Sequence, residues 1–356
     1  MKVLMTVPSF HVLGGVASHY MGLRPHWQGE VVYHTIGRRR HLPAVVTFLP
    51  DLVLFVWRLL FGGFDAVLLN SSFKSHPIRR DGLLLRLCSL FGIPTAVFFH
   101  GWNPAVYDAV KSNPTQFVKT FNRARFIYVL FSGFAENLKD LGVKSPIRLT
   151  TTKVGDEFVK DFDIENRDGV IEQILFLARA DKAKGLDVTV KAFEIAKQRC
   201  PSLRLCVCGD GNALQSAKDY VQAHGISDVT FRGFVKGQEV IECFRDSQLY
   251  ILPTTHGEGM ATSILEAMAL GLVVVTRPVG GVMDFFEQDK MGVLLESVDP
   301  EDYAEAIIRY VQDPALVRIT ARHNHEYACD HFMASSVAQS IWDDLRELLK
   351  EKNCKK

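Results

Sequence analysis

Short runs of β-branched and other apolar residues alternate with helical patterns along most of the chain, and this alternation strongly constrains the fold. The runs cover 2–7, 65–70, 94–100 and 125–131 in the first half, and 173–178, 203–209, 229–233, 248–253 and 272–276 in the second. Repeated alternation of this kind is typical of parallel sheets covered by helices on both faces. Two such sets predict two doubly wound α/β domains.

The length and the position of polar segments suggest where these domains end. A chain of 356 residues that is 47% hydrophobic has room for about two domains with sizeable cores. The polar segment 150–169 separates the two sets of runs. We therefore expect a first domain over 1–160, a second domain over 161–335 and a C-terminal helix over 336–356.

Two features argue against secretion and against a structural metal. The chain has seven cysteines without a C-x-x-C pair, and Cys206 and Cys208 alternate within a strand-like run, as small core residues do. A reducing cytosol is the simplest compartment for them. The first ten residues contain too short an apolar run for a signal peptide.

The most apolar stretch, residues 42–63, falls short of a membrane span. Pro50, Asp51 and Arg58 interrupt it, so it has no uninterrupted run of about 18–20 apolar residues. We expect a helix that begins near Pro50, since proline suits the first helical turn.

The loops after the predicted strands are where chemistry is expected, because open α/β sheets bind ligands outside the carboxyl ends of their strands. Gly14 and Gly15 can let backbone N–H groups approach a phosphate, although they also suit an ordinary turn. His100 can bond a substrate or be a core histidine. Arg179 and Lys184 suit a diphosphate, although a solvated basic loop is the alternative.

The segment THGEGMATSILEAMALG, residues 255–271, places two glutamates near the end of another run. Ser263 and Glu266 match the S-x-x-E capping box, so Glu266 could serve only to cap its own helix. The same helix start would present N–H groups at 262–264 to an anion. Glu258 lies between two glycines, and capping does not explain it. This favours ligand hydroxyl groups as its partners.

The spacing Glu258-x7-Glu266 resembles the signature of retaining glycosyltransferases of family four. Further similar motifs are GGVASH, HGW, ARADKAKGLD, CVCGDGN, FRGFV and PVGGVMDFFEQDKMGVLLE, so the resemblance covers most of the chain and is more specific in its second half. Ala261 departs from the Gly or Pro often found in relatives. The resemblance implies the α/β GT-B fold, in which two Rossmann-like domains face a cleft and a C-terminal helix crosses back to the first domain.

The resemblance also implies roles for individual residues. Glu266 would bind the ribose hydroxyls of the nucleotide, and Glu258 would contact hydroxyls of the transferred sugar. Arg179 and Lys184 would neutralise the diphosphate, and His100 would contact the sugar near its reacting carbon. The expected donor-binding set is Gly14, Gly15, Gly209, Gly259, Met260, Thr262, Ser263, Ile264 and Glu266.

No metal or other cofactor is expected. The other glycosyltransferase class holds a divalent metal with an Asp-x-Asp pair. The only such pair in this sequence, Asp161 and Asp163, lies in the predicted junction between the domains. We interpret it as part of a solvated linker.

The function that follows is transfer of a sugar from a nucleotide diphosphate sugar, expected to be UDP-linked, to a glycan or lipid-linked acceptor in cell-surface polysaccharide synthesis. One alternative is an epimerase or hydrolase of the same fold. Another is a non-catalytic scaffold that binds nucleotide sugars. A nucleic-acid binder is disfavoured, because the chain lacks interleaved basic and aromatic residues and a recognised module.

Charge is divided unevenly along the chain. Residues 1–150 hold 17 Lys and Arg against seven Asp and Glu, a net charge of +10, whereas the remainder holds 24 against 33, a net charge of −9. The basic residues include Arg38, Arg39, Arg40, Arg79 and Arg80, the last two beside leucines of the segment 74–92. Basic residues next to an apolar helix face suit an anionic membrane. We expect a cytoplasmic protein, peripheral on the inner face of the plasma membrane; a core helix with solvated arginines is the alternative.

Overall fold

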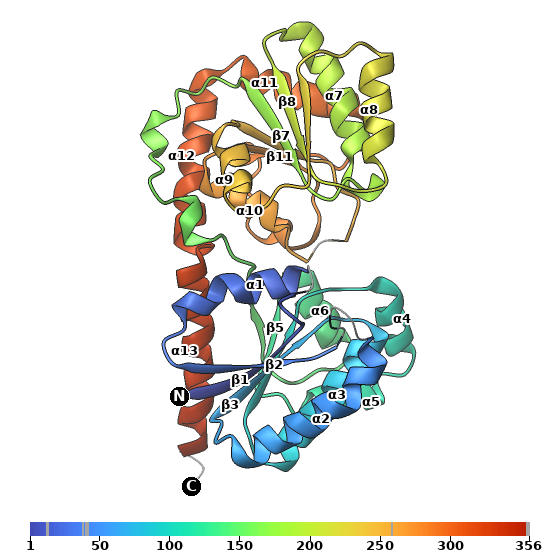
Figure 1. The fold of residues 1–356 in the computed structure, drawn as a ribbon, viewed down its shortest axis with the longest axis vertical. Coiled ribbons are helices and arrows are strands. Elements are labelled where there is room, and N and C mark those ends of the chain that lie inside the picture. Colours follow the sequence, from blue (N-terminus) through green and yellow to red (C-terminus); the bar gives the residue numbers. More distant parts are fainter. Residues whose placement is uncertain (12–13, 38, 40–42, 258, 354–356) are drawn as a thin grey trace. The chain divides into compact units, whose positions relative to one another are not determined.

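The computed structural model describes residues 1–11, 14–37, 39, 43–257 and 259–353, which form two compact units (Figure 1). The first unit comprises Met1–Lys153 and Ala334–Lys356, with the short segment that ends at Met260. The second comprises Val154–Gly257 and Ala261–Met333. The predicted boundaries, 160/161 and 335/336, lie a few residues beyond those of the units.

The first unit is built on a six-stranded parallel sheet with the order β2-β1-β3-β4-β5-β6. Its strands are β1 (Lys2–Val7), β2 (Glu30–Thr35), β3 (Ala66–Ser71), β4 (Thr95–Phe99), β5 (Ile127–Val129) and β6 (Ile147–Leu149). The inner strands β3 and β4 are buried along their whole length, which is why their sequences are continuous apolar runs. The strand order reverses between β1 and β3.

Helices cover both faces of this sheet. They are α1 (Gly15–Leu23), α2 (Ala44–Phe61), α3 (Ser75–Leu90), α4 (Pro104–Ser112), α5 (Thr115–Phe121), α6 (Ser132–Asp140) and α13 (Ala334–Asn353), with the 3-10 turn η1 (Arg24–His26). Phe55 of α2, Leu84 of α3 and Phe121 of α5 pack into one apolar core. Tyr20 of α1 and Trp342 of α13 pack into the core on the other side. The predicted return of the C-terminal helix to the first unit is confirmed.

The helix α2 is longer than predicted. It begins at Ala44 rather than near Pro50, and Pro50 lies inside it. Proline removes a donor from the carbonyl four residues earlier, here that of Val46. Val46 and Pro50 are both exposed, so water can hydrate that carbonyl. Within the described residues, no helix combines the length and the apolar character that crossing a membrane requires.

The second unit repeats the plan with the strand order β12-β11-β10-β7-β8-β9. The strands are β7 (Gln173–Leu177), β8 (Arg204–Cys208), β9 (Val229–Gly233), β10 (Leu249–Leu252), β11 (Val273–Thr276) and β12 (Gly292–Leu294). The helices are α7 (Leu186–Arg199), α8 (Leu214–Ala223), α9 (Gln238–Arg245), α10 (Thr262–Ala269), α11 (Pro300–Val311) and α12 (Pro314–His331), with 3-10 turns η2 (Asp156–Phe158), η3 (Ile164–Asn166), η4 (Lys182–Lys184) and η5 (Gly280–Asp284). The predicted pair of doubly wound parallel sheets is confirmed.

Candidate functional site

The strand order of the second unit determines which loops can share a ligand. Chain direction across the sheet reverses between β7 and β10, which are hydrogen-bonded neighbours. Ligands of doubly wound sheets bind at such a switch point, outside the carboxyl ends of the strands. The loop after β7 carries Arg179 and Lys184, and the segment after β10 leads to Glu266. The topology therefore gathers the predicted donor residues of this unit at one edge of its sheet.

Backbone contacts hold the loop after β7 against the loop after β8. The amide of Ala180 donates to the carbonyl of Asp210 at 3.0 Å, and the amide of Ala213 donates to the carbonyl of Ala180 at 2.7 Å. Gly209 has φ +139°, and a Cβ there would lie 1.8 Å from the carbonyl oxygen of Ala178. Only glycine fits so close an approach of two backbones. Gly209 is thus a residue that shapes the site.

The loop after β7 is also tied to the segment after β10. The carbonyl of Ala183 accepts hydrogen bonds from the amide of Thr255, at 2.8 Å, and from the amide of His256, at 3.2 Å. Lys184 is half-buried at the end of η4, next to Ala183. These bonds fix the base of Lys184 beside the loop that contains the first glutamate of the E-x7-E motif. Glu258 itself lies outside the described residues.

Arg179 extends into solvent at the same edge. Its side chain is 66% exposed, and its Nη1 lies 2.9 Å from a carboxylate oxygen of Asp181. An exposed ion pair of this kind contributes little to stability. A diphosphate can therefore compete with Asp181 for the guanidinium group, which suits bidentate phosphate contacts.

The start of α10 differs from the predicted capping box. The helix begins at Thr262 with Ala261 as its N-cap, so Ser263 is the second helical residue. The hydroxyl of Ser263 lies 2.7 Å from the hydroxyl of Tyr250, which also donates to the carbonyl of Leu177 at 3.0 Å. Glu266 lies in the second turn, too far along to take the capping-box position. The alternative in which Ser263 and Glu266 form a capping box is therefore not observed, because Ala261 rather than Ser263 is the N-cap residue.

Four more residues of the predicted donor set lie next to this helix start in the chain or within the helix. Gly259 and Met260 are half-buried and precede it directly, and Ile264 is buried in its first turn. Glu266 is half-buried rather than solvated. The N-terminus of α10 adds a partial positive charge at the switch point. A ligand with both phosphates and hydroxyl groups matches this combination.

A buried polar network occupies the corresponding edge of the first unit. His100 follows β4, and its Nε2 lies 2.8 Å from Oδ1 of Asn70 on β3. The hydroxyl of Tyr20 donates to the same oxygen at 2.6 Å, while Nδ2 of Asn70 donates to the carbonyl of Thr6 at 2.8 Å. Because Oδ1 can only accept, His100 must carry its proton on Nε2. The Nδ1 atom of His100 is then a hydrogen-bond acceptor.

His19 is a member of this region that sequence reasoning missed. It is buried in α1, and its ring centroid lies 5.5 Å from that of His100. Neither ring nitrogen of His19 has a hydrogen-bond partner among the described residues. Burial, reinforced by the charge of Lys153, lowers the pKa of His19 to about 3. Burial likewise holds the pKa of His100 well below its usual range, so both rings are neutral at pH 7.

Gly14 and Gly15 stand at the start of α1. Gly14 is the N-cap residue and Gly15 the first helical residue. A Cβ at either position would meet no heavy atom within 4 Å, so both glycines border open space. Packing therefore does not require glycine there, and approach of a ligand to the backbone remains the functional explanation.

The predicted membrane arginines divide into several groups. Arg39 pairs with the buried Asp51, and Arg80 contacts the buried Asp81 at 2.7 Å. Arg79 is exposed. Arg38 and Arg40 lie outside the described residues. The apolar face assigned to segment 74–92 requires correction, because Leu84 and Leu85 of α3 are packed in the core and are not available to lipid.

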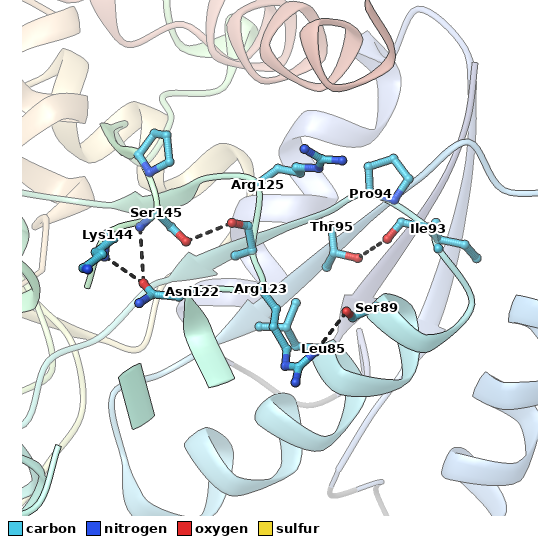
Figure 2. A pocket seen from close by; sticks show the side chains of 13 residues that line it. Leu85, Ser89, Ile93, Pro94, Thr95, Asn122, Arg123, Arg125, Lys144 and Ser145 are labelled. Atoms are coloured by element: carbon cyan, nitrogen blue, oxygen red, sulfur yellow. Dashed lines mark hydrogen bonds between the residues drawn. The ribbon is translucent and has the colours of Figure 1, made fainter. Parts of the chain in front are cut away.

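Two cavities of the first unit lie at opposite edges of its sheet. One, of about 770 Å³, lies at the carboxyl ends of β1 and β2 and is lined by residues of α2 and α3. The other, of about 530 Å³, lies at the amino ends of β4, β5 and β6 (Figure 2). There the side-chain oxygen of Asn122 accepts from the amide of Lys144, and Ser145 donates to the carbonyl of Ala124. Polar groups of this second cavity are thus bonded to one another.

Three cysteines of the second unit lie together. The Sγ atom of Cys208 is 3.6 Å from that of Cys206 and 3.4 Å from that of Cys243, and all three residues are buried. Among the described residues, they are the one His, Cys or acidic cluster with spacing suited to a metal ion. Their position in the core agrees with the prediction that Cys206 and Cys208 are small core residues.

Comparison with known proteins finds a family match within the second unit. Residues 159–328 match the family of glycosyl transferases group 1. The amylovoran biosynthesis glycosyltransferase AmsK of Erwinia amylovora is 24% identical over 227 residues, which cover 62% of this chain and 55% of AmsK. The D-inositol 3-phosphate glycosyltransferase of Paenarthrobacter aurescens is 34% identical over 140 residues, which cover 38% of this chain and 34% of that protein. The chain spans 60% or less of the length of these and other curated relatives it matches.

Solved structures extend the comparison to the whole fold. Anabaena HepE in complex with UDP superposes with a TM-score of 0.74 at 16% identity, over 98% of this chain and 100% of that chain. A likeness at this identity concerns the fold. The two-domain α/β architecture is that of the GT-B fold, as the resemblance implied.

Proposed function

We propose that the protein is a retaining glycosyltransferase that moves a sugar from a UDP-linked donor to a glycan or lipid-linked acceptor in cell-surface polysaccharide synthesis. The observation that carries this proposal is the gathering of Arg179, Lys184 and the N-terminus of α10 at the switch point of the unit that matches the group 1 family. The name of AmsK, a glycosyltransferase of amylovoran biosynthesis, supports the polysaccharide pathway, and the UDP complex of HepE supports the nucleotide.

Charge at the leaving group is the main chemical demand. Breaking the bond between sugar and phosphate leaves a nucleoside diphosphate with developing negative charge. A cation about 4 Å away contributes about 4 kcal/mol at an effective dielectric constant of about 20. Arg179, Lys184 and the dipole of α10 together supply this stabilisation without a metal in the proposed mechanism.

The two glutamates divide recognition of the donor. Glu266, half-buried on α10, binds the ribose hydroxyls, and Glu258 contacts hydroxyls of the transferred sugar. Carboxylates are acceptors of hydrogen bonds from such hydroxyls. Since no second carboxylate is assigned as a nucleophile, the acceptor attacks from the same face as the departing diphosphate, within an ion pair, and the anomeric configuration is retained.

The first unit supplies neutral polar groups for sugars. His100, with its proton fixed on Nε2 by Asn70, offers Nδ1 to a sugar hydroxyl. Its lowered pKa keeps this acceptor available at pH 7. The net charge of +10 on residues 1–150 supports the proposal that this unit works at the anionic inner face of the plasma membrane.

Product analysis tests this proposal. Purified protein is incubated with a panel of UDP-sugars, with and without a membrane lipid extract as acceptor and with EDTA present. We expect UDP release that depends on acceptor, and a product whose anomeric proton signal shows retention. Release without acceptor would favour the hydrolase alternative, and an inverted product would overturn the mechanism. A scaffold would bind donor without release.

A further inference from the structure

The helix α2 exposes an apolar face to solvent. The side chains of Leu49, Val53, Trp57 and Phe61 are 56–70% exposed, and they recur at intervals of four residues along the helix. This spacing places them in one stripe on the helix surface. Val46, Leu54 and Leu60 widen the stripe. A contiguous set of large, exposed apolar side chains is typical of an interaction site.

The opposite face of α2 is also apolar, and this face is covered. Phe55 and Leu59 pack in the core of the first unit, with Thr47 and Asp51 buried beside them. A helix that is apolar on both sides needs an apolar environment on both sides. The core covers only the inner side. The outer side therefore requires a partner outside the described chain.

A cavity of about 770 Å³ adjoins this helix. Phe48 and Leu52 of α2 form part of its wall, Leu83 and Leu84 of α3 form another part, and Ile36 closes it from the end of β2. Figure 1 shows α2 and α3 beside each other on one face of the sheet. The cavity is largely apolar and lies next to the exposed stripe, so a long apolar molecule can extend from one to the other.

The rim of the cavity is cationic. Arg79 lines it, and no carboxylate among the described residues pairs with Arg79. The two acids nearby are neutralised, since Asp51 pairs with Arg39 and Asp81 with Arg80. The carboxylates are thus compensated and one guanidinium is left for an anion.

We infer that this site binds a membrane amphiphile with a phosphate head group: the outer face of α2 lies in the surface of an anionic bilayer, and the adjoining cavity takes the phosphate end of one lipid against Arg79. This inference rests on the proposed function and narrows its acceptor to a lipid-linked phosphate. It places lipid contact on α2 rather than on Leu84 and Leu85 of α3, which are in the core.

A protein partner fits these observations less well. The exposed Arg79 of α3 lines the adjoining cavity, and its charge complements anionic lipid. An exposed apolar helix face that carries Leu, Trp and Phe, here Leu49, Trp57 and Phe61, is typical of helices that lie in the membrane interface. A cavity that combines a cationic rim with apolar walls matches a lipid phosphate better than it matches a peptide.

Vesicle flotation tests the surface with the full chain. The variant L49Q/V53Q/W57Q changes three exposed residues, and the matched control F234Q/V298Q/I319Q changes three exposed apolar residues of the second unit. We expect wild type and control to float with vesicles of phosphatidylcholine and phosphatidylglycerol, and the α2 variant to lose binding by roughly tenfold or more. Equal flotation of wild type and α2 variant would overturn the inference, as would failure of wild type to float.

Calorimetry with dodecyl phosphate tests the cavity. We expect R79A to weaken the binding of dodecyl phosphate by roughly tenfold. The control R86A, on α3 outside the cavity lining, should leave this affinity unchanged. Dodecanol tests the contribution of the alkyl chain alone, and inorganic phosphate tests that of the head group alone. Both should bind more weakly than dodecyl phosphate. Equal affinity of R79A and wild type would refute the phosphate contact. Binding of UDP by the L49Q/V53Q/W57Q variant separates failure at this site from failure of the donor site.

Discussion

At the scale of single residues, the first unit holds three histidines whose pKa is lowered by burial. His19, His34 and His100 all have a lowered pKa, and burial is the largest cause for each. For His34 the charges of Arg58 and Arg39 add to the effect, and its pKa falls to about 4. The three rings keep their neutral form at pH 7. For His100, this suits the hydrogen bond to a sugar hydroxyl that the proposed function assigns to it.

The pH dependence of stability follows from these shifts. In the unfolded chain each ring takes up a proton near pH 6.5, whereas in the folded unit it does so only at lower pH. The unfolded state therefore binds more protons in this window, and stability falls as pH drops from about 6.5 to about 4. Each histidine contributes a slope of about 1.4 kcal/mol per pH unit.

Urea unfolding measured by tryptophan fluorescence checks this, because all four tryptophans lie in the first unit. We expect His19→Leu to reduce the slope of stability against pH between pH 6.5 and 4.5 by about 1.4 kcal/mol per pH unit. His76→Leu, at an exposed position, is the control and should leave the slope unchanged. An unchanged slope in the His19 variant would show that the pKa of this ring is the same in the folded and the unfolded chain.

At the scale of elements, close approaches of backbone shape the donor loops. Gly209 lies where the loop after β8 meets the loop after β7, and a Cβ there would lie 1.8 Å from a carbonyl oxygen. Gly225 also has a positive φ, of +61°, but a Cβ there would meet nothing within 4 Å. Substitution of Gly209 and of Gly225 therefore separates the effect of a steric clash on stability from the effect of a positive φ alone.

We expect Gly209→Ala to destabilise the second unit by more than about 2 kcal/mol and to abolish UDP binding, since the two loops must separate. Gly225→Ala is expected to lower stability by about 1 kcal/mol and to leave UDP binding intact. Thermal unfolding and calorimetry of both variants check this. Similar effects of the two substitutions would mean that the loops do not depend on the close contact.

Elements with continuous apolar runs could be predicted from the sequence, and short edge elements could not. The strands β1, β3, β4 and β5 and β7 to β11 were predicted. In contrast, β2 carries Glu30 and His34 and is largely half-buried, and β6 and β12 have three residues each, so none of them stands out as an apolar run. The start of α2 was missed because an internal proline resembles a helix start.

The sequence predicted which loops lie at the carboxyl edge of the sheet, but it did not predict which side chains hydrogen-bond to one another. The loops with Arg179, Lys184 and Gly209 were predicted because parallel strands bring their carboxyl ends to one edge. The network of Asn70, Tyr20 and His100 depends on tertiary pairing, as does the bond that removes Ser263 from a cap. One signal was available for His19, which lies four residues after Gly15 and so one helical turn from the glycine loop.

At the scale of the whole molecule, the two units differ in charge. The basic first unit carries the apolar face of α2, and the acidic second unit carries the loops with Arg179 and Lys184. We propose that the first unit meets the lipid surface and that the second unit binds the soluble, anionic donor. Binding of the acceptor and binding of the donor are therefore expected to be affected by different sets of substitutions.

Titration of UDP into the full chain in the presence of EDTA tests whether the loops of the second unit bind a nucleoside diphosphate without a metal. Arg179→Ala and Glu266→Ala change the predicted diphosphate and ribose contacts, and Arg204→Ala is the control, because Arg204 is exposed at the amino end of β8 and pairs with Glu172. We expect UDP binding by wild type and by the control, and roughly tenfold or greater weakening of UDP binding in the other two variants. Absence of UDP binding by wild type, or equal affinity in all four proteins, would contradict this expectation.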